Sequence, residues 1–158
     1  MSPYTAIRPL YETQIAAHLK RDFLSARHFL GVYSREELPP VHSYPSSCVA
    51  NTHHSSQEGE HWVAIYFDAS GNGEYYDSFG LPPVYSAWED YLDNNSRGWV
   101  YMAKTCQPLS SFACGYYAIA YIMLRSRGKS PQDIMNMFSS DLHRNDVFVY
   151  DYANRNYK

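Results

Sequence analysis

The most constraining feature of this sequence is an apolar stretch in its C-terminal half. Residues 114–124 (CGYYAIAYIML) carry no charged side chain and are apolar almost all round when arranged as a helix. The rest of the protein must surround such a helix, because a surface helix keeps one polar face. The full apolar run, residues 112–124, is shorter than the ~20 residues that a membrane span needs. We therefore expect a buried central helix in a soluble domain.

Length and charge limit what surrounds that helix. A chain of 158 residues falls within the usual range of one domain, so we expect a single domain over residues 1–158. The net charge is −3 and no basic run is present, so strong nucleic-acid binding is not expected. The N-terminus has no signal-like region, and three cysteines without a CxxC pair argue against a secreted disulfide framework. These features predict an intracellular, reducing compartment.

Upstream of the central helix, the pattern predicts one helix followed by strands. Ile15 and Leu19 lie on one face of an amphipathic pattern, which is typical of a helix, here over residues 11–24. Ser34 and Glu37 resemble a capping box, and the prolines that follow limit it to a single helical turn. Two further expectations are a short strand over residues 48–52 and a polar surface loop over residues 53–60.

A β-hairpin is predicted next. Residues 62–67 and 74–79 are β-prone, and the Gly-Asn-Gly sequence at residues 71–73 is a turn signal between them. The remaining expectations are a helix over residues 84–92 opened by two prolines, a strand over 99–103, a helix from Ser130 to about residue 138, and a last strand over 147–150. Strands grouped before a central helix predict an α+β fold.

Cys114 opens the central helix and is followed by Gly115. Backbone N–H groups and the dipole at a helix N-terminus favour a thiolate, so this cysteine is placed where a nucleophile would be. A free cysteine in an apolar segment is equally well explained as a buried structural residue. Position alone leaves both interpretations open.

His61 and Asp77 belong to the two strands of the predicted hairpin. His61 directly precedes the first strand, and Asp77 lies sixteen residues later, near the end of the second. A nucleophilic thiol needs an imidazole to take its proton, and the imidazole needs a carboxylate or an amide to fix its tautomer and orientation. The two residues offer these groups to Cys114.

Gln107 lies seven residues before Cys114, on the loop that enters the helix. Its side-chain amide and the backbone N–H of Cys114 could point at the same reacting carbonyl, and two such donors make an oxyanion hole. A lone glutamine on a loop is usually solvated. Its combination with the other three residues supports the catalytic interpretation.

The residues that support catalysis occur in a characteristic order: His61-Trp62, Asp77, Gln107 and Cys114-Gly115. This order resembles the adenovirus-type (adenain-like) cysteine endopeptidases, whose relatives are the SUMO-specific (Ulp1-like) proteases, and similar blocks cover roughly residues 10–125. The resemblance implies a papain-like α+β fold, with a central mixed or antiparallel sheet flanked by helices. It also implies a thiol protease with a Cys-His-Asp triad, a Gln oxyanion hole and no cofactor.

Details of the motif distinguish the two branches. The seven-residue step from Gln107 to Cys114, with Ala113 before the nucleophile, is similar to the adenovirus motif. Asp77 stands where adenovirus enzymes usually carry Glu, which points weakly towards the SUMO proteases. No cysteine matches the one that binds the adenovirus activating peptide, and Cys106 is out of place for it. The missing cysteine argues against control by an activating peptide of the adenovirus kind.

The viral branch implies a monomeric endopeptidase that matures precursor proteins of a virus or a virus-like mobile element. It would act in the host nucleus or cytoplasm, or packaged in the virion. Enzymes of both branches cut beside glycine, which a narrow slot would recognise. Trp62 is our candidate for one wall of that slot, and a place in the core is the alternative.

Three other interpretations stay open at this stage. An isopeptidase that removes ubiquitin-like modifiers would use the same catalytic groups, but it would need a broad surface for the folded modifier. A binding module with a protease-like fold would not need to keep all four catalytic residues. A zinc site is disfavoured, because none of the available residues shows zinc-ligand spacing: Cys48, His53, His54, Cys106 and Cys114.

Overall fold

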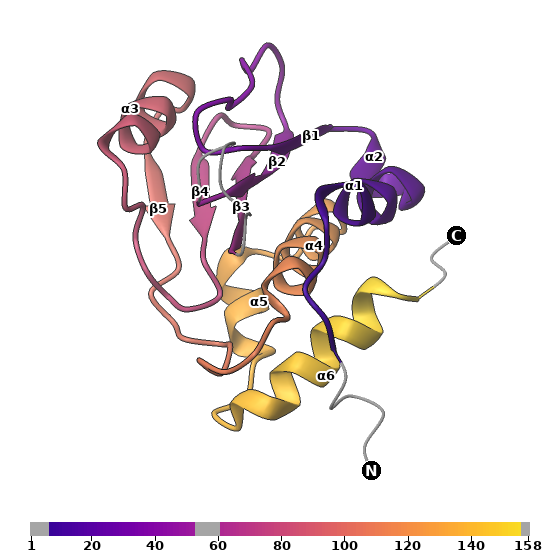
Figure 1. Ribbon diagram of the computed structural model, residues 1–158. Helices are drawn as coiled ribbons and strands as arrows, with labels where there is room; N and C mark the ends of the chain where they lie inside the picture. The colour runs from indigo at the N-terminus through magenta and orange to yellow at the C-terminus, as the bar shows by residue number, and fades with distance from the viewer. Residues whose placement is uncertain (1–6, 53–60, 156–158) are drawn as a thin grey trace.

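A single mixed sheet organises the chain. The computed structural model describes residues 7–52 and 61–155. The strands are β1 (Phe29–Tyr33), β2 (Ser46–Asn51), β3 (Trp62–Phe67), β4 (Gly73–Tyr76) and β5 (Trp99–Tyr101). They lie in the sheet in chain order (Figure 1). The outer pairs, β1 with β2 and β4 with β5, are parallel, and β3 is antiparallel to both its neighbours. The predicted α+β class with a mixed sheet is confirmed.

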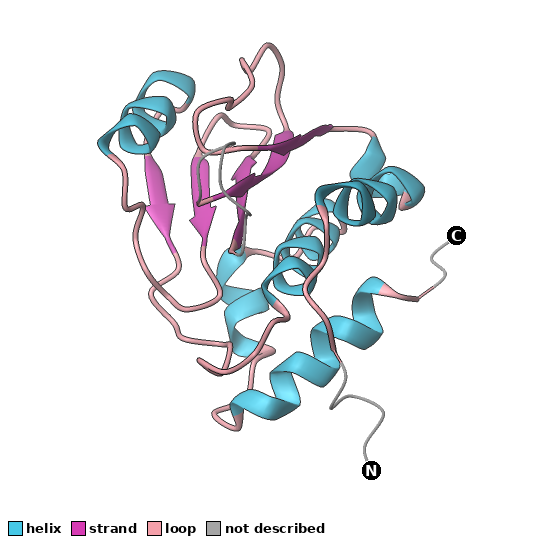
Figure 2. Cartoon of the chain, viewed as in Figure 1, coloured by secondary structure: helices cyan, strands magenta, loops and turns pink. Residues whose placement is uncertain are grey.

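The described helices are α1 (Glu12–Arg21), α2 (Phe23–Ala26), α3 (Ser86–Asn95), α4 (Cys114–Ser126), α5 (Pro131–Asn136) and α6 (Leu142–Ala153). They lie on both sides of the sheet (Figure 2). The predicted helix over residues 11–24 is divided in two, because Asp22 has an extended backbone and its side chain accepts a hydrogen bond from Ser25 N to cap α2. Ser130 caps α5 as predicted. Within the described ranges, no helix is long and apolar enough to cross a membrane.

The sheet has an apolar core on each face. Along β3, alternate side chains point to opposite faces, as the period of a strand requires. Trp62, Ala64 and Tyr66 join the larger core, which is centred on α4. Val63, Ile65 and Phe67 face the second core, which contains Trp88 and Leu92 of α3. All residues of α4 from Cys114 to Leu124 are buried, so the prediction of a central helix is confirmed.

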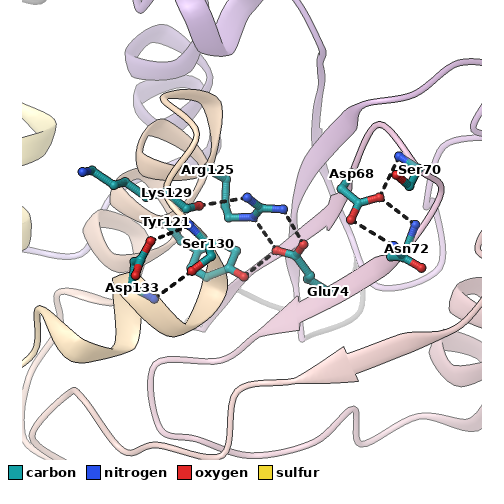
Figure 3. Close-up of polar contacts among 9 residues, drawn as sticks. All are labelled: Asp68, Ser70, Asn72, Glu74, Tyr121, Arg125, Lys129, Ser130 and Asp133. Atoms are coloured by element: carbon teal, nitrogen blue, oxygen red, sulfur yellow. Dashed lines mark hydrogen bonds and ion pairs between the residues drawn. The ribbon is translucent and has the colours of Figure 1, made fainter.

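The predicted hairpin is formed by β3 and β4, with Phe67 opposite Gly73. Asp68 organises the turn, because its Oδ1 accepts hydrogen bonds from the backbone N–H groups of Ser70 and Asn72, both at 2.9 Å (Figure 3). Gly71 has a φ of 87°, a left-handed conformation that glycine adopts without steric cost.

Several predicted boundaries are wrong. The predicted last strand, residues 147–150, lies inside α6; Val149 is part of the core centred on α4, and Phe148 and Tyr150 pack against that core. The predicted helical turn after Ser34 is only a hydrogen-bonded turn, closed by Glu37 N and Ser34 O at 3.1 Å. α3 begins at Ser86, after the prolines that were predicted to open it. β4 and β5 are both shorter than predicted. The loop predicted over residues 53–60 lies outside the described residues.

Candidate active site

The β3–β4 hairpin brings His61 and Asp77 together. Ala64 pairs with Tyr76 in the register, so His61, directly before β3, and Asp77, directly after β4, lie at the same end of the sheet. Nε2 of His61 is 2.9 Å from Oδ1 of Asp77. Their side chains are 18% and 6% exposed, so this contact is largely protected from water.

The turn after β4 holds both partners. Phe79 donates its backbone N–H to Oδ1 of Asp77 at 2.8 Å, and its ring stacks on the imidazole of His61 with centroids 5.0 Å apart. Gly80 N donates to Asp77 O at 2.8 Å and closes the turn. The imidazole is therefore fixed at one edge by a carboxylate and on one face by an aromatic ring.

The electrostatics of His61 depend on two neighbours. Burial by itself lowers the pKa of His61, but hydrogen bonds and charge interactions with Asp77 and Cys114 outweigh this effect and raise the pKa to about 9. Because Nε2 of His61 is hydrogen-bonded to Asp77, Nδ1 is the ring nitrogen available to the thiol of Cys114. The protonated imidazole is thus the favoured form at neutral pH.

Cys114 is the first residue of α4 and is 3% exposed. β3 packs against α4 in the larger core, which brings the start of the helix beside the residue that precedes β3. The N–H groups of a first helical turn have no partner within the helix and point outward from its end. The thiol therefore lies where a helix N-terminus meets the imidazole of His61.

Gln107 is 1% exposed, and its side-chain amide is held at both ends. Oε1 accepts a hydrogen bond from Ser78 Oγ at 2.5 Å. Nε2 donates to the backbone oxygen of Ser111 at 3.0 Å and lies 3.3 Å from Ser111 Oγ. The glutamine is thus not a solvated loop residue. Its amide connects Ser78 with Ser111, in the loop that leads to the nucleophile.

The backbone at Gln107 is held from two directions. Ser78 O accepts hydrogen bonds from the N–H groups of Cys106 and Gln107, at 2.8 and 3.1 Å. Cys106 O accepts from Asn145 Nδ2 at 2.9 Å and from the Tyr117 hydroxyl at 3.2 Å. Three residues that support the site were not predicted from the sequence: Ser78, Tyr117 and Asn145. Only Ser78 carried a signal, because it directly follows Asp77.

Trp62 lies in the larger core and is 6% exposed. Its indole Nε1 donates to the backbone oxygen of Leu10 at 3.0 Å, which ties the segment before α1 to the start of β3. Leu10 also contacts the first turn of α4, since a Cβ on Gly115 would lie 3.2 Å from Leu10 Cβ. These contacts favour the core interpretation of Trp62.

The other two cysteines are buried. Burial raises the pKa of Cys48 to about 12 and also raises the pKa of Cys106, so neither thiol ionises readily. The three cysteines all lie among the described residues and form no disulfide bonds. Among the described residues, no group of three or more His, Cys, Asp or Glu side chains could hold a metal ion. His53 and His54 lie outside this part of the chain.

Comparison by sequence finds no matching family model and no matching curated protein. The fold, however, is similar to that of the ASFV pS273R protease. One crystal structure matches with a TM-score of 0.67 and 20% identity over 94% of this chain and 68% of the protease. A selenomethionine form matches with a TM-score of 0.66 and 18% identity over 99% and 71%. The predicted adenain-type protease fold is confirmed.

A further similar structure is the central domain of the uncharacterized Lpg1148 protein from Legionella pneumophila. It matches with a TM-score of 0.53 and 14% identity over 93% of this chain and 94% of that domain. At these identities the likeness establishes a shared fold.

Proposed function

We propose that this chain is a cysteine endopeptidase in which Cys114 is the nucleophile, His61 the general base and acid, and Asp77 the residue that orients His61. The observation that carries the proposal is the position of His61, which interacts with both Asp77 and Cys114. A thiol, an imidazole and a carboxylate in this arrangement are the groups that thiol proteases use. The fold shared with the pS273R protease supports the same conclusion.

The reaction follows from these groups. His61 takes the proton of the Cys114 thiol, and the resulting thiolate adds to the peptide carbonyl carbon as the electron pair of the C=O bond moves to oxygen. The side-chain amide of Gln107 and the N–H of Cys114 stabilise that oxyanion. His61, which now carries that proton and whose pKa is raised to about 9, gives it to the leaving amine as the C–N bond breaks. Water, deprotonated by His61, then hydrolyses the thioester and releases Cys114.

The substrate class is a polypeptide cut beside glycine, and the precursor proteins of a virus or virus-like element are the proposed targets. On this account the protein is a single-domain monomer that acts inside the host cell or in the virion and needs no cofactor. An isopeptidase would use the same chemistry on a modifier attached to lysine. The two activities would be separated by comparing a linear glycine peptide with a ubiquitin-like conjugate.

Hydrolysis of a fluorogenic peptide amide ending in Gly-Gly tests the proposal. Wild type and Cys48→Ala, a matched change at another buried cysteine, are expected to release the fluorophore, because burial keeps Cys48 out of the reaction. Cys114→Ala is expected to release none. Full activity in Cys114→Ala would rule out the proposed nucleophile.

A further inference from the structure

Ser78, the residue after Asp77, contacts the proposed oxyanion donor Gln107. Ser78 is 1% exposed, and its hydroxyl is 2.5 Å from Gln107 Oε1. Asp77 and Ser78 are consecutive residues, so their side chains point in different directions from one short segment: Asp77 towards His61 and Ser78 towards Gln107. One dipeptide therefore contacts both the base and the proposed oxyanion donor.

The direction of the Ser78–Gln107 hydrogen bond follows from Ser111. The backbone oxygen of Ser111 can only accept, so the amide group 3.0 Å from it must be the Nε2 side of Gln107. The Oε1 side then faces Ser78, and a carbonyl oxygen also only accepts. The Ser78 hydroxyl must donate its single proton to Oε1.

We infer that Ser78 is a positioning residue for the oxyanion hole, and this inference rests on the proposed protease function. Its hydroxyl holds the Gln107 amide in one orientation, with Nε2 directed towards Ser111 in the loop that leads to Cys114. A donor that is already oriented needs no reorganisation when charge develops on the substrate oxygen. Donation to Oε1 also polarises the amide and strengthens its N–H donors.

An alanine at position 78 would remove only the side-chain part of this support. The backbone oxygen of Ser78 would still accept from Cys106 N and Gln107 N, so the loop would keep its main-chain clamp. Oε1 would lose its hydroxyl partner inside the protein, and the amide would be held from the Ser111 side alone. The effect is expected on the transition state that carries an oxyanion, and not on the contact between Cys114 and His61.

Two reactions of Cys114 separate these effects. Acylation by a glycine-terminated peptide amide forms a tetrahedral oxyanion, whereas alkylation by iodoacetamide displaces iodide at carbon and forms none. The test measures kcat/KM for the amide and the rate of Cys114 alkylation in wild type, Ser78→Ala, Gln107→Ala and the double variant. Ser25→Ala is the matched control, because Ser25 is a fully buried serine that donates to a different side chain, Asp22.

We expect Ser78→Ala to lower kcat/KM for the amide by about 10- to 100-fold, mainly through kcat, and to leave alkylation within about twofold of wild type. In the Gln107→Ala background the Ser78 change should have no further effect, because the residue it positions is gone. Ser25→Ala should be normal in both reactions.

Three outcomes would overturn the inference: wild-type acylation in Ser78→Ala, equal losses of acylation and alkylation, or multiplicative losses in the double variant. Each of these leaves the proposed protease function standing. Failure of wild type to hydrolyse the amide while Cys114 is still alkylated would instead contradict the proposed function, and the inference with it.

Discussion

The carboxylate of Glu74 on β4 is bound by the guanidinium of Arg125 on α4, through Nε at 2.8 Å and Nη2 at 2.7 Å (Figure 3). The Tyr121 hydroxyl donates to the same carboxylate at 2.6 Å. Glu74 lies three residues before Asp77, and Arg125 lies on the helix that Cys114 opens. The ion pair therefore links the strand that leads to the acid with the helix that carries the nucleophile.

Loss of Arg125 should destabilise the protein strongly. The side chains of Glu74 and Arg125 are only 4% and 12% exposed. Removing one partner of a buried ion pair leaves the other charge uncompensated, which lowers the free energy of unfolding by about 3 to 5 kcal/mol. Arg125→Met should lower the free energy of unfolding by that amount in urea titrations. Arg144→Met, at an exposed arginine on α6, should change it by less than about 0.5 kcal/mol. Equal changes in the free energy of unfolding for the two variants would show that the Glu74–Arg125 ion pair does not stabilise the protein.

The stability of the protein should fall at alkaline pH because of His61. Despite the opposing effect of burial, the pKa of His61 is raised in the folded state, from 6.5 to about 9. A raised pKa stabilises the folded state fully below pH 6.5, and that stabilisation is lost as the pH rises through about 9. The contribution is on the order of 3 kcal/mol.

The measurement is the free energy of unfolding of wild type and His61→Gln between about pH 5.5 and 9.5. The difference between the two proteins should shrink across this window. A difference that stays constant with pH would mean that His61 is not held as an imidazolium.

Gly80 should not tolerate a side chain. Its φ is +77°, and a Cβ would lie 2.8 Å from the backbone carbon of Lys104 and 2.9 Å from Ala103 O. Because strain and a backbone clash combine there, Gly80→Ala should lose about 2 to 4 kcal/mol of stability. Gly98→Ala is the control, since nothing lies within 4 Å of its Cβ position. The measurement is thermal unfolding of the two variants. A similar loss of stability in Gly80→Ala and Gly98→Ala would contradict this account of the turn.

Asn145 should matter more than its place on a C-terminal helix suggests. It is 2% exposed, donates to Cys106 O and Ser139 O at 2.9 Å, and accepts from Ser139 N at 2.8 Å. Asn145→Ala removes these three hydrogen bonds and leaves Cys106 O with only the Tyr117 hydroxyl as a side-chain donor, so we expect a loss of about 2 to 4 kcal/mol and slower acylation of Cys114. Asn136→Ala, at an exposed asparagine, should be neutral in denaturant unfolding and in turnover. Normal acylation in a folded Asn145→Ala protein would show that α6 does not support the loop.

Much of the fold follows from local patterns in the sequence. The apolar composition of residues 114–124 required burial of α4, and the continuous apolar run of β3 fits an apolar layer on each face of the sheet. The same local reasoning failed for residues 147–150, where a β-prone composition occurs inside a helix. Tertiary packing of Val149 and Tyr152 against α4 overrides that propensity.

The candidate site was only partly predictable. The juxtaposition of His61 and Asp77 follows from hairpin geometry, because strands joined by a short turn bring flanking residues together. The supports of Gln107 do not follow in this way. Asn145 reaches Cys106 O from 39 positions along the chain, and no local pattern in the sequence encodes a contact over that separation.

The central claim is that His61 activates Cys114, and the most direct test is to locate the adduct of a peptide electrophile that ends in glycine. Wild type, His61→Ala and Cys114→Ala would be treated with the reagent and digested for mass spectrometry. We predict an adduct confined to Cys114, formed much more slowly in His61→Ala and absent in Cys114→Ala. Labelling spread over Cys48 and Cys106, or labelling of Cys114 at the same rate without His61, would contradict the account and favour a protease-like binding module.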